Sequence, residues 1–432
     1  MNAAVGKSGP GADEPLAASA PPVAARVNAL DGLRGCLALI VALAHACETL
    51  YPAISGHGRN HFVFDRLLQK SPFALFLSAD LAVRIFFVHS GFVLSLKYFR
   101  SRDARWPTVM FIRRPWRLGL PVFASTMLAL ALSKLMPFDA HALRHAGARV
   151  VAGLGETHPT IALALRDGLW RTVTTGYSHL PGAWWTMPIE LYCSLGLLAV
   201  LVLWNHMVAP VRIAVIAVYF ALLALSIVHN PLAPPLVSSN AATEARLVFL
   251  LSFTFVLGAG LSFAWADHHA AWTEFVSRNR GFVAVIFGGG LLVGVFPSSL
   301  KTVFGDNTSA VEVAFMGSAA IIVAGVLSWS ALQRFFERPL IAWLGRISFS
   351  LYLIHLSVQR TFMDRTFIWL RARGLPYNAS AVLALIVMFA CALALAHLLT
   401  ITADRAAINA GKGWLYRRFR LTARATGLSG VT

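Results

Sequence analysis

The chain has 432 residues, of which 57% are hydrophobic and only 13% are charged. A typical soluble domain carries about 25% charged residues. This composition, with a mean hydropathy of +0.66, therefore excludes a soluble globular protein and predicts a polytopic membrane protein. The formal net charge of +18 lies in short connections between apolar stretches and not on one soluble basic domain, so we expect no nucleic-acid partner.

The predicted fold is all-α, a polytopic membrane bundle of about ten transmembrane helices. In chain order, the apolar spans are about 33–52, 73–96, 117–136, 184–204, 210–229, 245–265, 281–298, 311–329, 343–362 and 379–400. The predicted organisation is a disordered cytoplasmic tail (1–28), a transmembrane domain (29–403) and a basic cytoplasmic tail with a candidate amphipathic helix (404–432).

The charge of the connections predicts the orientation of the bundle. The connection 97–117 is the densest basic stretch, with Lys97, Arg100, Arg102, Arg105, Arg113, Arg114 and Arg117. The positive-inside rule places it in the cytoplasm. Counting spans in both directions then places both termini in the cytoplasm.

Three ionisable side chains reach the same depth of the predicted bilayer. His45 follows Arg34 by eleven residues in an otherwise apolar run, which corresponds to about 16 Å of helix. By the same count, Glu190 lies about 9 Å from the outer edge and His355 about 18 Å from the inner edge. Ionisable groups in the central third of a bilayer are functional candidates, because their placement there is costly.

Two imidazoles and a carboxylate at one depth predict a proton-handling cluster, in which Glu190 orients His45 and raises its basicity. Structural alternatives stay open. Glu190 is also expected to form an ion pair with Arg34 or Arg84, because buried carboxylates are normally paired. Each histidine also suits a polar contact with a neighbouring helix.

Five segments of the chain form a recognisable set in sequence order. They are LDGLRGCLALIVALAH (30–45), RIFFVHSGFVLS (84–95), RRPWRLGLP (113–121), WWTMPIELYCS (184–194) and LGRISFSLYLIH (344–355). The most specific element is Arg34 followed by ten residues and His45, supported by Ser-Gly-Phe at 90–92 and Arg-x-x-Arg at 114–117. Together these segments resemble the membrane acyltransferase 3 family, the integral-membrane O-acyltransferases of polysaccharides, lipids, antibiotics and Nod factors.

The resemblance implies an acyl-CoA donor, usually acetyl-CoA, that approaches from the cytoplasm, and a hydroxyl acceptor on a carbohydrate or glycolipid. It implies that His45 is the catalytic histidine with Arg34 as its companion, and that Arg114 and Arg117 contact the donor. Guanidinium groups suit the phosphates of CoA, because their forked donors bind phosphate directionally. The structural alternative is that Arg114 and Arg117 mark topology and contact lipid headgroups. We expect no cofactor and no metal.

Further side chains surround this predicted base. Ser90 and Tyr352, together with Arg34, are candidates to stabilise a developing oxyanion. Arg84 stands where many relatives carry an aspartate, and we expect it to pair with Asp80 or Glu190. The supporting residues are predicted to be Ser90, His89, Arg84, Tyr352 and His355.

The preferred hypothesis is a membrane-embedded O-acyltransferase in which His45 acts as a general base. An acyl-histidine relay is the mechanistic alternative. A proton-coupled transporter or lipid flippase, in which midplane histidines relay protons, is the functional alternative. In each case we expect a multi-pass protein of the bacterial inner (plasma) membrane.

Overall fold

The structure is a computed structural model whose described residues form helices and no strands. Residues 1–22 and 420–432 of the two predicted tails lie outside the described residues. The described residues are 23–55, 60–63, 65–69, 71–151, 159–228, 241–296 and 308–419.

The polytopic helical membrane bundle predicted from the sequence is confirmed. Within the described ranges, eight helical segments are long and apolar enough to cross a membrane, and two shorter apolar stretches, 209–225 and 280–294, match the remaining predicted spans. The helices at the ten spans are α1 (Val23–Leu50), α3 (Ala79–Ser101), α4 (Arg105–Leu135), α8 (Met187–Trp204), α9 (Ala209–Val228), α10 (Ala241–Asp267), α12 (Arg280–Val295), α14 (Thr308–Ser328), α16 (Pro339–Val358) and α18 (Tyr377–Leu399).

Short elements connect and extend these helices. The short α-helices are α2 (Asp65–Gln69), α5 (Ala140–His145), α6 (Ile161–Arg166), α7 (Thr172–Thr175), α11 (His269–Arg278), α15 (Ser330–Phe336), α17 (Asp364–Ala372), α19 (Arg405–Asn409) and α20 (Lys412–Arg418). The 3₁₀ turns are η1 (Pro52–Ser55), η2 (Pro72–Leu77) and η4 (Trp184–Thr186), and the π-helical turns are η3 (Asp167–Arg171), η5 (Gln359–Met363) and η6 (Thr400–Asp404).

The predicted boundaries around the basic connection 97–117 are wrong. Helix α3 continues through Ser101 and α4 begins at Arg105, so only three residues separate the two helices. The basic residues interrupt the hydropathy pattern, but all of them except Arg102 lie within one of the two helices. The reason is packing: Trp106 of the first turn of α4 is buried in a small cluster with Tyr98 and Leu201. Arg114 and Arg117 therefore lie on a helix and not in a loop.

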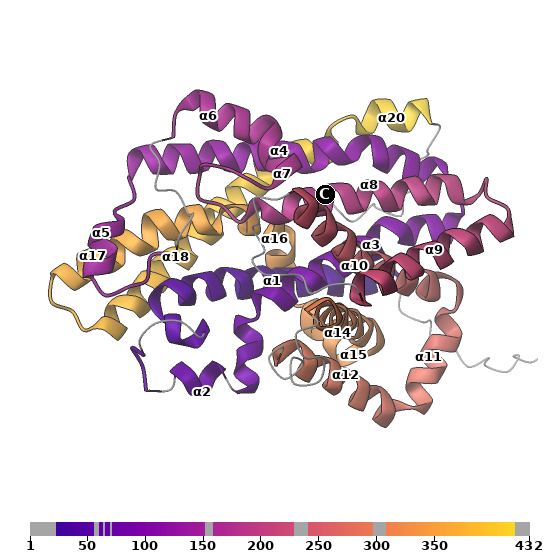
Figure 1. Cartoon of the computed structure of the whole chain (residues 1–432), viewed down its shortest axis with the longest axis horizontal. Coiled ribbons are helices and arrows are strands. Elements are labelled where there is room, and N and C mark those ends of the chain that lie inside the picture. The colour runs from indigo at the N-terminus through magenta and orange to yellow at the C-terminus, as the bar shows by residue number, and fades with distance from the viewer. Residues whose placement is uncertain are drawn as a thin grey trace, which may run out of the picture.

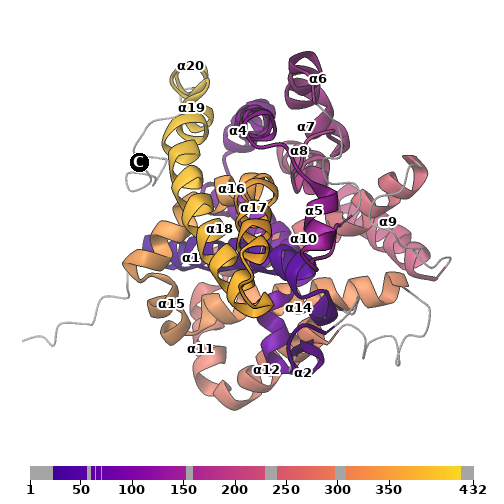
Figure 2. The ribbon, with the colours of Figure 1, turned by 90° about the vertical axis from the view of Figure 1, so that its left-hand side faces the viewer.

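The elements are arranged along one long axis. In Figure 1, α4, α8 and α18 run along this axis, with α5 and α17 at one end and α20 towards the other. Figure 2 looks along the axis and shows α16 near the centre, between α4 on one side and α14 on the other. The core is thus built around α16, whose buried face runs from Leu344 to Val358.

Helices α1 and α16 approach each other more closely than side chains would permit. A Cβ atom added to Gly35 would lie 2.5 Å from the backbone nitrogen of Gly345, and one added to Gly345 would lie 2.6 Å from the carbonyl carbon of Asp31. His45 and His355 each follow the crossing glycine of their own helix by ten residues. Because the glycines meet and the histidines also meet, the two helices run in the same direction and in register.

Helices α3 and α10 also approach each other closely at glycines. A Cβ atom added to Gly91 of α3 would lie 2.7 Å from the Cα atom of Phe255, and one added to Gly258 of α10 would lie 2.7 Å from the backbone nitrogen of Phe92. Each helix thus packs a glycine against the backbone of the other. This contact fixes the position of α3, which carries His89 and Ser90.

We expect Gly345→Ala to lower the apparent midpoint of thermal unfolding in detergent. The added methyl group meets the backbone of α1, and forced overpacking costs about 1–3 kcal/mol. The matched control is Gly317→Ala in α14, where nothing lies within 4 Å of the added atom. There the gain in helix propensity, about 1 kcal/mol, should raise the midpoint. A higher midpoint for Gly345→Ala would contradict the close crossing.

Candidate functional site

The two midplane histidines form a direct pair. Nδ1 of His45 lies 2.9 Å from Nε2 of His355, and the two rings are nearly parallel, at 7° with their centroids 5.1 Å apart. His355 is fully buried, whereas the side chain of His45 is partly exposed. The prediction that these two residues share one level of the bundle is therefore matched by a contact between them.

The backbone decides which nitrogen of each neutral ring carries the proton. The carbonyl oxygen of Tyr352 lies 2.7 Å from Nδ1 of His355 and can only accept, so His355 Nδ1 donates to it. His355 Nε2 is then an acceptor, and His45 Nδ1 donates to it. Nε2 of His45 is left with a lone pair, and no described residue forms a hydrogen bond with it. This is the form of imidazole that a general base requires.

A cavity of about 240 Å³ lies on the Arg34 side of this pair, between α1, α3, α4, α8 and α16, and we call it the inner cavity. Of the ten predicted site residues, seven line it. Its polar lining consists of Arg34, His89, Ser90, Arg114, Arg117, Thr186, Glu190, Ser348 and Tyr352. Its apolar lining consists of Val83, Phe86, Phe87, Val93, Leu94, Leu118, Met187 and Phe349.

Tyr352 separates the inner cavity from the histidine pair. It lines the cavity, and its ring centroid lies 5.8 Å from that of His355. The hydroxyl groups of Tyr352 and Thr186 are 2.9 Å apart, and Phe86 contacts the edge of the tyrosine ring. His45 and His355 are not among the cavity-lining residues. The cavity thus does not reach the predicted base, and Tyr352 and then His355 lead from its wall to His45.

The predicted contact between Glu190 and His45 is wrong, as are both predicted ion-pair partners of Glu190. Its carboxylate pairs with Arg114, whose Nε also donates to the hydroxyl oxygen of Ser194 at 2.7 Å. Both side chains are almost buried. Glu190 therefore pairs with Arg114 of α4 and not with His45, because a buried guanidinium needs a counter-charge more than a neutral imidazole does.

Arg84 lies outside the inner cavity and is held by two acidic residues. Its guanidinium forms a two-pronged ion pair with Glu312 of α14, with distances of 2.7–3.0 Å. It also donates to the backbone oxygen of Asp80 at 2.7 Å, with the Asp80 carboxylate 3.5 Å away. The predicted contact with Asp80 is present and the predicted contact with Glu190 is not. Arg84 therefore joins α3 to α14.

His89 and Arg34 meet at Asp31 of α1. The Asp31 carboxylate lies 3.6 Å from Arg34 and 3.9 Å from Nε2 of His89. His89 is 4% exposed and lines the inner cavity. Asp31 was not predicted as a site residue. It stands three residues before Arg34 on the same helix, and opposite charges at that spacing indicate an ion pair.

A second cavity, of about 220 Å³, adjoins the inner cavity on the side of α20, and we call it the vestibule. Leu94, Arg114 and Arg117 line both cavities. The vestibule is lined by Leu94, Trp106, Met110, Arg113, Arg114, Arg117, Ile408, Lys412 and Tyr416. Arg117 forms an ion pair with Asp404 of η6 and lies over the ring of Phe349. The guanidinium groups of Arg114 and Arg117 are therefore both paired with carboxylates.

A polar side chain that the sequence did not single out ties α1 to the π-helical turn η5. The amide of Gln359 donates to the hydroxyl of Thr49 at 2.8 Å and to the carbonyl oxygen of His45 at 3.3 Å. A π-helical turn shifts the face of a helix and is frequent at functional sites. Gln359 therefore fixes the turn of α1 that carries His45.

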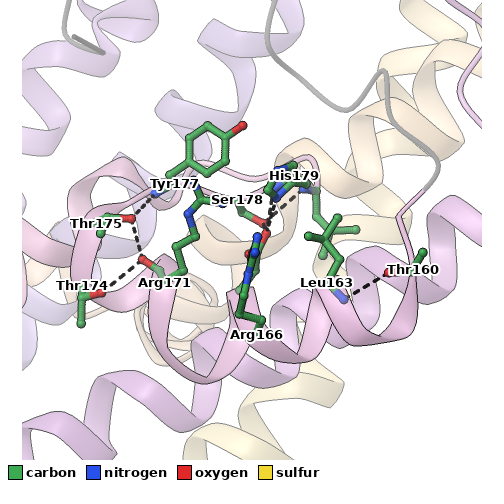
Figure 3. A network of polar contacts seen from close by, with 11 residues as sticks. Thr160, Leu163, Arg166, Arg171, Thr174, Thr175, Tyr177, Ser178 and His179 are labelled. Carbon is green, nitrogen blue, oxygen red and sulfur yellow. Dashed lines mark hydrogen bonds and ion pairs between the residues drawn. The ribbon is translucent and has the colours of Figure 1, made fainter. Parts of the chain in front are cut away.

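A separate polar network, shown in Figure 3, is formed by α6, η3 and α7 in the connection 137–183. Asp167 is fully buried and accepts hydrogen bonds from the backbone nitrogen and from Nδ1 of His179, both at 2.9 Å. Arg166 also donates to it, at 3.2 Å. Burial alone would raise the pKa of Asp167, but these hydrogen bonds outweigh burial and hold the pKa below its usual value.

The sequence model of one protein family, described as an acyltransferase domain, matches residues 27–397 of the chain. No curated protein and no solved structure matches the chain at a significant level. The matched range contains all the predicted site residues and ends before Asp404, α19 and α20.

We expect Glu190→Gln to lower the apparent unfolding midpoint in detergent strongly, because it leaves Arg114 as an unpaired, nearly buried charge. Breaking a buried pair in this way costs about 3–5 kcal/mol. Removing both charges together, in Arg114→Met with Glu190→Met, should recover much of the loss. A wild-type midpoint for Glu190→Gln would contradict the ion pair.

We expect Asp167→Asn to lower the unfolding midpoint at pH 7 by removing a carboxylate whose folded-state pKa is depressed. Such a group stabilises the fold above its unfolded pKa of about 3.9, and the contribution is lost as pH falls through the lower folded pKa. The difference between variant and wild type should therefore shrink below about pH 4. Glu274→Gln, which removes an exposed pair on α11, is the control with little effect. A difference that persists unchanged at low pH would refute this account.

Proposed function

Since the chain belongs to the acyltransferase domain family and is a membrane acyltransferase, we propose that it transfers an acyl group, acetyl in the first instance, from acyl-CoA to a hydroxyl of a carbohydrate or glycolipid. The single observation that carries the proposed mechanism is the chain of hydrogen bonds from His45 through His355 to the carbonyl of Tyr352. It leaves Nε2 of His45 as an unprotonated nitrogen inside the membrane-spanning bundle.

In this mechanism His45 acts as the general base. Nε2 takes the proton of the acceptor hydroxyl while the hydroxyl oxygen attacks the thioester carbonyl carbon. The tetrahedral intermediate then breaks its carbon–sulfur bond, and the CoA thiolate leaves with the proton returned by His45. During the step His45 is an imidazolium, and its Nδ1–H continues to donate to His355, which places the positive charge against a lone pair. In this general-base mechanism the acyl group passes directly from the thioester to the acceptor, so no nucleophile other than the acceptor hydroxyl is needed.

The inner cavity is the proposed site of the thioester. Arg34, Ser90 and Tyr352, the three candidates for oxyanion stabilisation, all line it. Tyr352 lines the cavity beside His355, and in this proposal a movement of side chains at Tyr352 opens the cavity to His45. Glu190 is proposed as a positioning residue that holds Arg114 at the cavity wall.

We further propose a location in the bacterial inner membrane, with the Arg114 end of the bundle facing the cytoplasm. The support is the concentration of basic residues at the junction of α3 and α4. A donor that carries phosphates and a cavity whose wall carries Arg34, Arg114 and Arg117 have complementary charges.

The test is release of free thiol from acetyl-CoA by purified protein, with an extract of candidate acceptors. His45→Ala should lose activity by about 10²–10⁴-fold, the contribution of a general base. His355→Gln keeps an oxygen that can accept from His45 Nδ1 and should retain more activity than His355→Leu. His141→Gln, at an exposed position of α5, is the control that should leave activity unchanged.

Two outcomes would contradict this proposal at different points. Full activity of His45→Ala would remove His45 as the base while leaving the acyl-CoA reaction in place. Absence of thiol release by the wild-type protein with every acceptor would reject the acyl-CoA donor itself and favour a proton-coupled transporter.

A further inference from the structure

The vestibule contains hydrogen-bond donors that have no acceptor. Trp106 is 7% exposed, and its Nε1 forms no hydrogen bond within the described residues. Nε of Arg113 is likewise buried and unpartnered. Lys97 does not line the vestibule, but its Nζ lies 4.0 Å from the centre of the Trp106 ring and is also buried and unpartnered. Buried polar atoms without partners are costly and rare, and all three of these atoms are hydrogen-bond donors. They indicate a ligand rich in acceptor oxygens.

The charge of the vestibule agrees with this indication. Four cations line it, and two of them, Arg114 and Arg117, are neutralised by Glu190 and Asp404. Arg113 and Lys412 have no carboxylate partner among the described residues. Instead, Arg113 donates to the carbonyl oxygen of Ile408 and lies over the ring of Tyr416. The site thus holds a surplus of positive charge, which a phosphate group would neutralise.

Two aromatic side chains accompany these cations. Trp106 of α4 and Tyr416 of α20 both line the vestibule. Aromatic rings beside cationic side chains suit a nucleotide, because the base stacks on a ring while its phosphates bind the cations. The apolar wall formed by Leu94 and Met110 does not suit a free sugar.

We propose that the vestibule binds the nucleotide end of the donor, the 3′-phosphorylated ADP of CoA, and that α20 supplies part of this site through Lys412 and Tyr416. This inference rests on the acyl-CoA donor proposed above. The pantetheine arm then passes Arg114 and Arg117, which line both cavities, into the inner cavity. Because α20 follows the range matched by the family, this half of the donor site belongs to the C-terminal segment of this chain.

The ion pair between Arg117 and Asp404 predicts the direction in which a substitution of Asp404 changes ligand affinity. A donor phosphate and the Asp404 carboxylate compete for the same guanidinium. Asp404→Asn should therefore tighten the binding of a phosphate-bearing ligand severalfold. A purely structural contact between η6 and α4 predicts no such tightening.

The binding test uses the full-length protein in phosphatidylcholine nanodiscs, titrated calorimetrically with adenosine 3′,5′-bisphosphate. Lys412→Gln should weaken binding about tenfold, as expected for one charge-assisted hydrogen bond, and Lys412→Arg should restore it. The matched control is Arg418→Gln, an exposed position of the same helix that does not line the vestibule. Equal binding by Lys412→Gln and Arg418→Gln, or no binding by the wild type, would overturn the inference.

A kinetic comparison separates this inference from the proposed function. S-acetylpantetheine carries the thioester but no nucleotide, so the wild type should show a KM about tenfold or more above that for acetyl-CoA. Lys412→Gln should raise the KM for acetyl-CoA and leave that for S-acetylpantetheine unchanged. Equal wild-type KM values would reject the nucleotide site alone. Consumption of neither thioester would reject the proposed function.

A lipid headgroup shares the phosphate chemistry, and a third arm tests it. Phosphatidylglycerol is added to the nanodiscs, and the titration with the bisphosphate is repeated. Unchanged binding supports a nucleotide site. A different result would overturn the inference and identify a lipid site. In that case phosphatidylglycerol abolishes bisphosphate binding by the wild type but does not change bisphosphate binding by Lys412→Gln.

Discussion

The close crossing of α1 and α16 is the constraint on which the predicted site depends. Gly35 and Gly345 allow the two backbones to meet, and each histidine follows its crossing glycine at the same spacing. Because two parallel helices that touch at one level stay in register over the next turns, the contact at the glycines delivers the contact between His45 and His355. A pair of small residues thus sets the geometry of a pair of polar ones.

The same bundle neutralises arginines inside its spans with carboxylates, three of them from distant elements and one from the next turn. An unpaired guanidinium inside a span is costly, and four of the buried or half-buried arginines each have a carboxylate partner. This rule explains why Glu190 is not available to orient His45: its charge is already used. A histidine takes that place, and a backbone carbonyl fixes its tautomer. The pairs are Arg84 with Glu312, Arg114 with Glu190, Arg117 with Asp404, and Arg360 with Asp364.

Two of these ion pairs lie at the boundary between the two cavities. Arg114 and Arg117 stand where the inner cavity and the vestibule meet, held from one side by α8 and from the other by η6. The histidine pair lies beyond Tyr352. This arrangement suits the proposed acyl-CoA donor, because its charged phosphates would stay at the arginine-lined cavities while its uncharged thioester enters the inner cavity.

The sequence by itself determined the membrane class and the apolar spans, and it predicted the depth of the ionisable groups, because composition and the rise per residue of a helix are local quantities. Seven of the ten residues that it singled out line one cavity of the structure. Only the tertiary structure decided which groups meet. Arg114 finds Glu190 across 76 residues of chain, Arg84 finds Glu312 across 228 and Arg117 finds Asp404 across 287. Depth along a helix is local, whereas the direction in which a side chain points at its neighbour depends on how helices distant in sequence pack together.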